Sequence, residues 1–262
     1  MARPPEPQPH PSAGRGEEVL PGRLSKERFG YSMPVDGSYY QSPPFYYRDA
    51  RSLTVLFETD PEAAADILPE GLELPLPAVA SLFIAYYPFT TFGPYHEAIL
   101  GLACLWQGER ATYMPQLATT TTPPLVAGRE IWGYAKKIAH IDLIEQDELL
   151  LGILERPKGT RLATAVMRRE RPVSSVPGLR ASISLRVIPS PEEGKPPSLA
   201  QLVLTRMREG VVHEAWQGPA HLSFDARSEL DPWHRLPVRR VLTAYYVRGD
   251  STLPGGQVIK EY

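Results

Sequence analysis

The stretch Ser182-Ile-Ser-Leu-Arg-Val-Ile188 alternates polar and apolar side chains from its first residue to Val187. A period of two is typical of a half-buried antiparallel β-strand. The same preference for β-branched and apolar residues recurs outward from it, at residues 52–57, 79–87, 98–106, 149–154, 161–167, 181–187, 199–206 and 218–224. These segments predict a mainly β protein of the α+β class.

Proline supports this interpretation and limits the helices. The 29 prolines are spread along the whole chain, and proline is excluded from helix interiors and central strands. Many short strands joined by turns are therefore expected, as a closed antiparallel barrel or a sandwich. Three short peripheral helices are predicted: residues 60–68, where Asp60 is a good N-cap, residues 128–137, and residues 237–242.

Two segments rich in Pro and Gly, at residues 1–28 and 189–197, bear on how many domains the chain forms. Residues 1–28 are rich in Pro, Gly, Arg and Glu without apolar periodicity, so a disordered or loosely draped tail is expected there. A single domain is expected over residues 29–262. The Pro- and Gly-rich stretch 189–197 has strand-like sequence on both sides and is interpreted as a hairpin loop.

Composition argues against several classes of function. The 262 residues carry a formal net charge of −2 with scattered basic side chains, so neither nucleic acid nor a membrane surface is an expected partner. No apolar run approaches the roughly 20 residues that span a bilayer, and the N-terminus has no apolar signal core. The single cysteine, Cys104, lies in an apolar run and is expected to be a buried small hydrophobe. A cytoplasmic location is the default expectation.

Metal and cofactor motifs were not found in the sequence. The six histidines lack metal-ligand spacing, so no metal site is predicted. There is also no glycine-rich phosphate loop and no Gly-x-Ser-x-Gly elbow. Any chemistry is therefore expected to proceed without a cofactor.

The segment Leu125-Val-Ala-Gly-Arg-Glu-Ile-Trp-Gly-Tyr-Ala-Lys-Lys-Ile-Ala139 places two lysines after an apolar and aromatic run. A protonated lysine cannot attack a carbonyl, and both burial and an adjacent cation disfavour the protonated form. Trp132 and its apolar neighbours can enclose one amine, while Glu130 can balance local charge. The alternative is a solvated Lys-Lys corner without chemistry.

This segment resembles the signature of the acetoacetate decarboxylase family, in which Gly-Arg-Glu precedes Tyr-Pro-Lys-Lys. The resemblance implies that Lys136 forms a Schiff base and that Lys137 makes its amine easier to deprotonate, as in the family. Ala135 replaces the usual proline. Further similar segments, from Phe57-Glu-Thr-Asp60 through Val212-His-Glu-Ala-Trp-Gln-Gly-Pro219 to the terminal Glu261-Tyr262, extend the resemblance from about residue 34 to the end.

The resemblance also implies a carboxylate upstream of the lysines. Gly93-Pro-Tyr-His-Glu97 matches that place, so Glu97 is expected to orient substrate or handle protons, although it could be an ordinary loop acid. Two family residues are not matched. Ungapped counting puts Leu82 where a second glutamate belongs and Ala50 where an arginine belongs, with Arg48 as a nearby candidate for substrate binding.

Tyr245 and Tyr246 match a strand that approaches the pocket in the family. A phenol there can act as an acid or base. The alternative is a pair of strand tyrosines, one packed and one exposed.

The functional prediction is a Schiff-base lyase acting on a small oxo acid, with decarboxylation of a 3-oxo acid such as acetoacetate as the family default. Loss of one acid also fits an aldolase–dehydratase that condenses a 2-oxo acid such as pyruvate with an aldehyde. A non-catalytic binding barrel is the alternative from another class, because a fold can persist without turnover. Assembly into a homo-oligomer is expected by the same resemblance.

Overall fold

The computed structural model describes residues 20–176 and 181–262. Most of the predicted tail, residues 1–28, lies outside the described part. The chain forms two compact units, with the boundary between Tyr39 and Tyr40. In the first unit the described segment contains one short 3-10 helix, η1, Lys26–Arg28.

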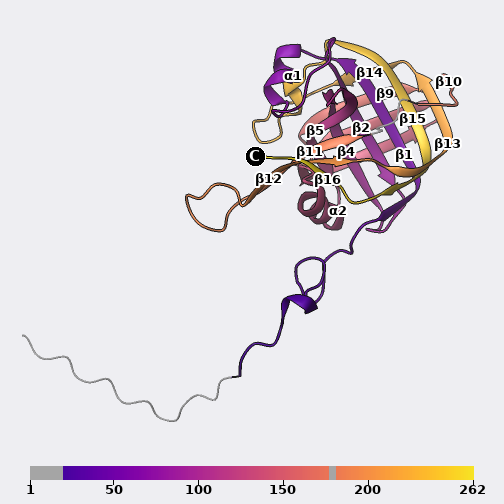
Figure 1. The fold of residues 1–262 in the computed structure, drawn as a ribbon. Helices are drawn as coiled ribbons and strands as arrows, with labels where there is room; N and C mark the ends of the chain where they lie inside the picture. Colours follow the sequence, from indigo (N-terminus) through magenta and orange to yellow (C-terminus); the bar gives the residue numbers. More distant parts are fainter. Residues whose placement is uncertain (1–19, 177–180) are drawn as a thin grey trace, which may run out of the picture. The chain divides into compact units, whose positions relative to one another are not determined.

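The second unit is built mainly from strands, as predicted (Figure 1). They are β1 (Phe45–Glu58), β2 (Val79–Tyr87), β3 (Phe89–Thr90), β4 (Tyr95–Trp106), β5 (Glu109–Thr119), β6 (Lys136–Ile138), β7 (His140–Gln146), β8 (Leu149–Glu155), β9 (Arg161–Arg168), β10 (Arg171–Pro172), β11 (Ser182–Ile188), β12 (Leu199–Thr205), β13 (Arg208–Gly218), β14 (Ala220–Ser223), β15 (Arg240–Leu253) and β16 (Gln257–Glu261). The helices are α1 (Pro61–Ile67), α2 (Thr122–Ala127), η2 (Gly128–Trp132) and η3 (Trp233–Arg235).

Two sheets organise these strands. The larger runs in the order β10-β13-β15-β1-β2-β4-β5-β11-β12-β16, and the smaller is β14-β9-β8-β7. Most pairs are antiparallel, but β5 pairs in parallel with both β6 and β11. Within the part of the chain described, the two ends of the larger sheet do not pair with each other, so the predicted closed barrel is not confirmed.

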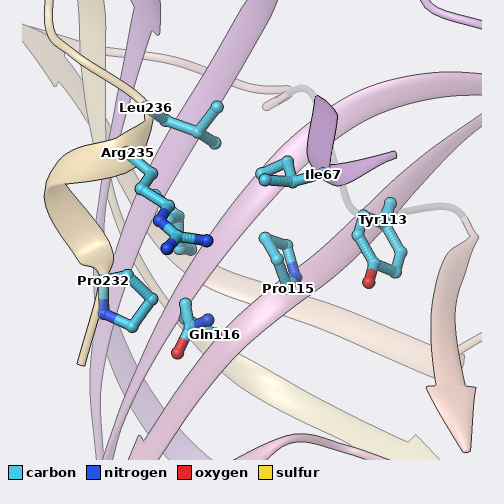
Figure 2. A pocket seen from close by; sticks show the side chains of 8 residues that line it. Ile67, Tyr113, Pro115, Gln116, Pro232, Arg235 and Leu236 are labelled. Carbon is cyan, nitrogen blue, oxygen red and sulfur yellow. The ribbon is translucent and has the colours of Figure 1, made fainter. Parts of the chain in front are cut away.

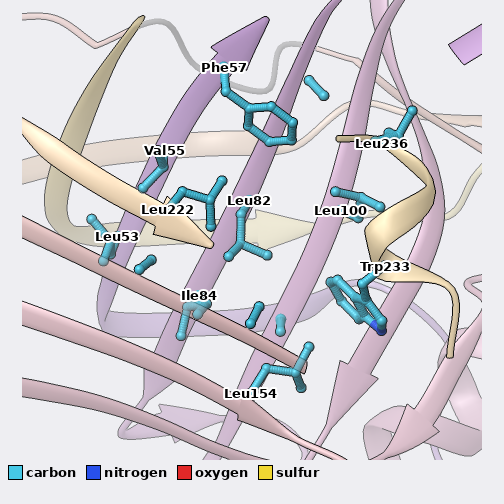
Figure 3. Close-up of a cluster of buried hydrophobic side chains, with 14 of the residues drawn as sticks. Leu53, Val55, Phe57, Leu82, Ile84, Leu100, Leu154, Leu222, Trp233 and Leu236 are labelled. Atoms are coloured by element: carbon cyan, nitrogen blue, oxygen red, sulfur yellow. The ribbon is translucent and has the colours of Figure 1, made fainter. Parts of the chain in front are cut away.

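The main core lies between the two sheets. Leu53, Val55 and Phe57 are fully buried at alternate positions of β1, as the period of a strand requires. Figure 3 shows them beside Leu82, Ile84 and Leu100 of the neighbouring strands β2 and β4, and the same cluster includes Leu150, Leu154 and Leu222 of the smaller sheet. Packing of two sheets face to face fits the sandwich alternative.

Cys104 belongs to a separate apolar cluster with Ile183 and Leu202. It is buried, as predicted, and burial raises its pKa to about 11. The thiol is therefore a packing group, with little of the thiolate that a nucleophile requires.

The helix predictions had mixed outcomes. At α1 the Asp60 side chain accepts a hydrogen bond from the Ala63 amide at 2.9 Å, and the helix ends at Ile67, two residues before Pro69. The predicted helix at residues 237–242 is wrong, because β15 begins at Arg240 and the short η3 lies upstream. Val238 and Val241 pack against the main core, which favours extended backbone for β-branched residues.

The helix predicted over residues 128–137 is also partly wrong. Helical structure begins earlier, at Thr122, and ends at Trp132. Gly133 then takes a left-handed conformation with φ 75°, and Lys136 lies on a strand. In the described residues, no helix has both the length and the apolar character needed to cross a membrane.

Candidate active site

A tight turn at Gly133 connects η2 to β6, the strand that carries Lys136. A Cβ at Gly133 would lie 2.3 Å from Arg186 Cα, so both the positive φ and the close approach require glycine here. The Tyr134 amide closes the turn by donating to the Gly128 carbonyl at 3.0 Å. Strand β6 then pairs with β5, where Lys136 lies opposite Leu117.

The Lys136 amine is buried against a carboxylate. Its side chain is 5% exposed, and Nζ lies 2.5 Å from Oε1 of Glu97 on β4. The amine also lies 5.7 Å from the ring centroid of Tyr95 and 5.6 Å from that of Tyr134. A Cβ at Gly128 would come within 3.0 Å of Lys136 Cδ and Cε, so this glycine leaves space for the lysine chain. The two sequence-predicted groups Lys136 and Glu97 are thus brought together.

Four buried phenols surround this pair. Tyr87 donates a hydrogen bond to Glu97 Oε2 at 3.1 Å, and the hydroxyls of Tyr47 and Tyr95 share one at 3.2 Å. Burial, and then the charge of Glu97, raise the pKa values of Tyr47, Tyr87 and Tyr95 above the usual range. Burial likewise raises the pKa of Tyr134. All four phenols therefore keep their protons and can act as donors at neutral pH.

Aromatic rings close one side of the site. Trp132 is 1% exposed and stacks on Tyr134 with centroids 5.4 Å apart. Its Nε1 donates to the Pro254 carbonyl, while Phe45 meets the indole edge-on at 5.6 Å. Trp132 thus forms part of the wall that separates the amine from water, consistent with its place beside the lysines in the sequence.

Glu130, which the sequence suggested could balance local charge, is bonded to a tyrosine. Its Oε2 accepts a hydrogen bond from the Tyr40 hydroxyl at 2.5 Å. Tyr40 and Trp132 belong to the same buried cluster, so Glu130 borders the aromatic wall. The structure does not pair Glu130 with either lysine.

Lys137 faces the other way, because consecutive residues of a strand point to opposite sides. Its Nζ lies 3.0 Å from Asp231 Oδ1 and also donates to the Leu230 carbonyl. Arg156 Nε lies 3.0 Å from the same carboxylate oxygen, which is largely buried. The structure therefore gives the two adjacent lysines separate partners, and the positive charge of Lys137 is balanced by Asp231.

Three other predicted residues lie away from this pair. Arg48 donates to the carbonyls of Tyr47 and Ser251, and its guanidinium lies 5.3 Å from the Tyr46 ring. Tyr246 belongs to the core between the sheets, and its hydroxyl donates to Glu145 at 3.3 Å. Tyr245, next along β15, points to the opposite side and is half-buried.

Leu82 and Ala50, the two positions where the sequence departs from the family, are both packed against apolar clusters. Leu82 is fully buried in the core between the sheets, on the face of β2 opposite the lysine. The other face of β2 presents Phe83, Ala85 and Tyr87 to the aromatic cluster, and none is an acid. Ala50 packs against the same cluster.

Sequence reasoning missed Tyr47, Tyr87 and Tyr95. Two signals were available, because Tyr95 lies two residues before Glu97 and Tyr87 ends a predicted strand. Side chains two apart on a strand share a face. The sequence alone does not predict the register of β2 with β4, which sets Tyr87 opposite Tyr95 and Ala85 opposite Glu97.

Two cavities among the residues that the structure describes lie away from Lys136 and Glu97, which line neither of them. The first, of about 170 Å³, lies between the η3 segment, the end of α1 and β5 (Figure 2). Figure 2 shows Pro232 and Arg235 on one side of it and Pro115 and Gln116 on the other. Lys136 and Glu97 are 5% and 6% exposed and lie among buried tyrosines.

Comparisons with known proteins identify the family of this chain. A family model described as acetoacetate decarboxylase (ADC) matches residues 32–262. Acetoacetate decarboxylase 2 of Mesorhizobium japonicum is 30% identical over 237 residues, covering 88% of this chain and 89% of the relative. Acetoacetate decarboxylase 1 of Bradyrhizobium diazoefficiens is also 30% identical, covering 90% and 94%.

Solved structures share the fold. The crystal structure of acetoacetate decarboxylase from Legionella pneumophila superposes with a TM-score of 0.83 at 26% identity, covering 93% of this chain and 99% of that one. The enduracididine biosynthesis enzyme MppR complexed with pyruvate has a TM-score of 0.75 at 20% identity, covering 90% and 99%, a likeness of fold alone. From the match over residues 32–262 and the relatives spanning nearly their whole length, this chain belongs to the acetoacetate decarboxylase family.

Proposed function

We propose that this protein is a Schiff-base lyase that decarboxylates a small 3-oxo acid through Lys136. The observation that supports this most is the 2.5 Å approach of a buried lysine amine to the Glu97 carboxylate inside a cage of tyrosines. Several of the most similar relatives carry the name acetoacetate decarboxylase. Acetoacetate is therefore the first substrate to test.

The proposed reaction needs no group beyond the chain and water. The neutral Lys136 amine attacks the ketone carbon, and loss of water gives an iminium. The bond to the carboxylate carbon then breaks, its electron pair moves into an enamine, and carbon dioxide leaves. Protonation of the enamine carbon and hydrolysis of the iminium release the ketone and regenerate the amine.

Glu97 and the aromatic cage have complementary roles in this scheme. Glu97 Oε1 lies 2.5 Å from Lys136 Nζ, so after the neutral amine has attacked the ketone it can take a proton from the nitrogen of the adduct and return it later. The rings of Tyr95, Tyr134 and Trp132 line the site and limit the contact of the amine with water.

A second candidate is the aldolase–dehydratase reaction, in which the same iminium activates a 2-oxo acid toward an aldehyde. The observation that favours it is the face of β2 toward the site, where Phe83, Ala85 and Tyr87 offer no second acid. Decarboxylation releases carbon dioxide, whereas condensation followed by dehydration creates a conjugated chromophore. The products therefore separate the two reactions.

The test combines a substrate screen with trapping of the imine. The protein is incubated with acetoacetate, pyruvate plus an aldehyde, and longer oxo acids, and product masses are recorded. Borohydride reduction with substrate present should add the substrate-derived mass to the Lys136 peptide, and Lys136→Met should abolish both the adduct and turnover. Lys158→Met, at an exposed loop lysine, is the matched control and should retain both.

The alternative of a non-catalytic binding protein has its own outcome. A ligand that binds, by calorimetry, without turnover and without a reducible adduct at Lys136 would contradict the Schiff-base proposal. Assembly into a homo-oligomer, which the family resemblance implies, is a separate proposal that sedimentation analysis tests.

A further inference from the structure

Glu97 has two oxygens with different partners. Oε1 lies 2.5 Å from Lys136 Nζ, and Oε2 accepts a hydrogen bond from Tyr87 at 3.1 Å. Glu97 is 6% exposed and Tyr87 is 8% exposed. A buried carboxylate is costly unless donors satisfy it, and an ionised one accepts through both oxygens.

Catalysis removes one of these partners. The Lys136 amine has to give up its positive charge before it can attack a carbonyl. When that happens, Glu97 loses its counter-charge but remains in a site largely closed to water. The Tyr87 phenol is then the donor that can keep the carboxylate ionised and oriented.

The other groups around the carboxylate do not replace Tyr87. The titratable groups near Glu97 on the elements that pack around it are Tyr47 on β1, Tyr95 on β4, Tyr134 after η2, and Lys136 on β6. Tyr47 and Tyr95 are bonded to each other at 3.2 Å. Burial, then the charge of Glu97, raise the pKa of Tyr87 well above its usual value, so this phenol remains a donor over the working pH range.

Strand register explains how Tyr87 reaches Glu97. Tyr87 lies opposite Tyr95, and Ala85 lies opposite Glu97, so Tyr87 and Glu97 are diagonal neighbours across β2 and β4. The small Ala85 side chain leaves the space beside Glu97 to the phenol. The rings of Tyr47 and Tyr95 lie 4.9 Å and 4.8 Å from that of Tyr87 and hold it in place.

We infer that Tyr87 is a positioning residue for the Lys136–Glu97 pair: its hydroxyl anchors Glu97 Oε2, so that the carboxylate remains an oriented proton acceptor when Lys136 becomes neutral. This rests on the proposed function only in taking Lys136 as the reacting amine. Without the phenol, deprotonation of Lys136 would leave a buried carboxylate lacking its O–H donor, so the amine should hold its proton to higher pH.

The experiment measures the neutral amine directly, without any oxo acid. The protein is treated with acetic anhydride, which acylates only the neutral amine, at a series of pH values, and acetylation of Lys136 is read by peptide mass spectrometry. For Tyr87→Phe, which keeps the ring, the midpoint of the profile should move up by about one pH unit, a tenfold change in proton affinity. The exposed Lys158 provides an internal reference in the same digest.

Two controls separate positioning from packing. Tyr113→Phe removes a buried phenol from a different cluster and should leave the Lys136 profile unchanged. In the Glu97→Gln background, Tyr87→Phe should cause no further displacement, because the carboxylate that the phenol serves is gone. Near-ultraviolet circular dichroism checks that each variant is folded.

The outcomes are distinct. A Tyr87→Phe profile that superimposes on the wild type, or moves to lower pH, would overturn the role of Tyr87. A displacement that persists in the Glu97→Gln background would also overturn it, because the phenol would not act through Glu97. Failure of the wild type to form a reducible adduct with any oxo acid would instead contradict the proposed function and leave the acylation result intact.

Discussion

At the scale of single residues, the site depends on a buried pair of opposite charges. Removing one member of a buried pair leaves the other uncompensated, which is usually more damaging than losing a surface contact. Lys136 and Glu97 therefore constrain each other, and the separate roles proposed for them are distinguished by measuring imine formation and turnover apart.

Glu97→Gln is predicted to separate imine formation from proton transfer. The amide cannot accept the amine proton or return it, so kcat should fall by about 10²- to 10⁴-fold, the usual contribution of general acid–base catalysis. Borohydride trapping at Lys136 should persist, since the amine itself is intact. Glu192→Gln, at an exposed loop acid, is the control. Loss of trapping in parallel with turnover would argue that Glu97 serves only to hold Lys136.

Gly133→Ala is predicted to destabilise the turn that delivers Lys136. The new Cβ would combine a φ of 75° with a 2.3 Å approach to Arg186 Cα, at a cost of about 1–3 kcal/mol or more in unfolding free energy. Gly159→Ala is the matched control, because Gly159 has a φ of 92° but nothing within 4 Å of its Cβ position. Urea unfolding of both variants isolates the contact with Arg186, and equal losses would contradict its importance.

The sequence identified the two central groups of this site but not their neighbours. Lys136 and Glu97 were predicted from short motifs, which a chain displays locally. The tyrosines depend on which face of β2 and β4 points to the lysine, and a slip of one residue exchanges the faces. Phe83, Ala85 and Tyr87 lie on the face of β2 toward the site, whereas Leu82 lies in the core between the sheets.

At the scale of elements, β6 has only three residues and depends on outside contacts. Arg129 donates to the Lys136 carbonyl at 3.3 Å, and Arg156 donates to the Ile138 carbonyl at 3.2 Å. Lys137 adds the contact with Asp231. The strand that carries Lys136 is therefore held at both ends by hydrogen bonds from arginines of other segments, and by the contact of Lys137 with Asp231.

Lys137→Met is accordingly predicted to act on stability more than on the amine of Lys136. It should lower the unfolding free energy by about 1 kcal/mol, since the pair is part-exposed and Asp231 keeps Arg156. The acid limb of the pH–rate profile should stay in place. Lys260→Met, which breaks a surface pair with Glu70, is the control and should cost less. An acid limb displaced to higher pH would instead support the tuning role that the family resemblance implies.

The starts of two predicted helices show why one prediction was confirmed and the other was wrong. Asp60 and Pro61 mark the start of α1 with side chains that act locally, and that prediction is confirmed. Pro237 carries a similar mark, yet the residues after it extend because Val238 and Val241 find partners in the core. Burial outweighed local preference there, and burial depends on distant segments of the chain.

At the scale of the whole molecule, strand content was predictable and strand pairing was not. The period of two revealed most of the strands, but the contact of β5 with β11 joins residues about seventy positions apart. No local pattern encodes such a pairing, so the barrel and the sandwich could not be separated from sequence. The core in Figure 3 shows how the two sheets enclose one apolar layer.

The many buried phenols predict that the fold weakens at alkaline pH. Burial raises the pKa values of Tyr113, to about 12, and of Tyr47, Tyr87, Tyr95 and Tyr134. A raised folded pKa stabilises the protein below the unfolded value, near 10, and that stability is lost as pH rises toward the folded value. Unfolding free energy should therefore fall steeply between pH 10 and 12.

Tyr113→Phe tests this at one position outside the site. At pH 11 the unfolded phenol is mostly ionised while the folded one is not, so the wild type should lose about 1 kcal/mol more than the variant between pH 8 and pH 11. Urea unfolding at the two pH values measures the difference, with Tyr46→Phe, at an exposed tyrosine, as the control. If wild type and Tyr113→Phe lose stability equally, the alkaline sensitivity arises from other groups and the burial of this phenol does not govern it.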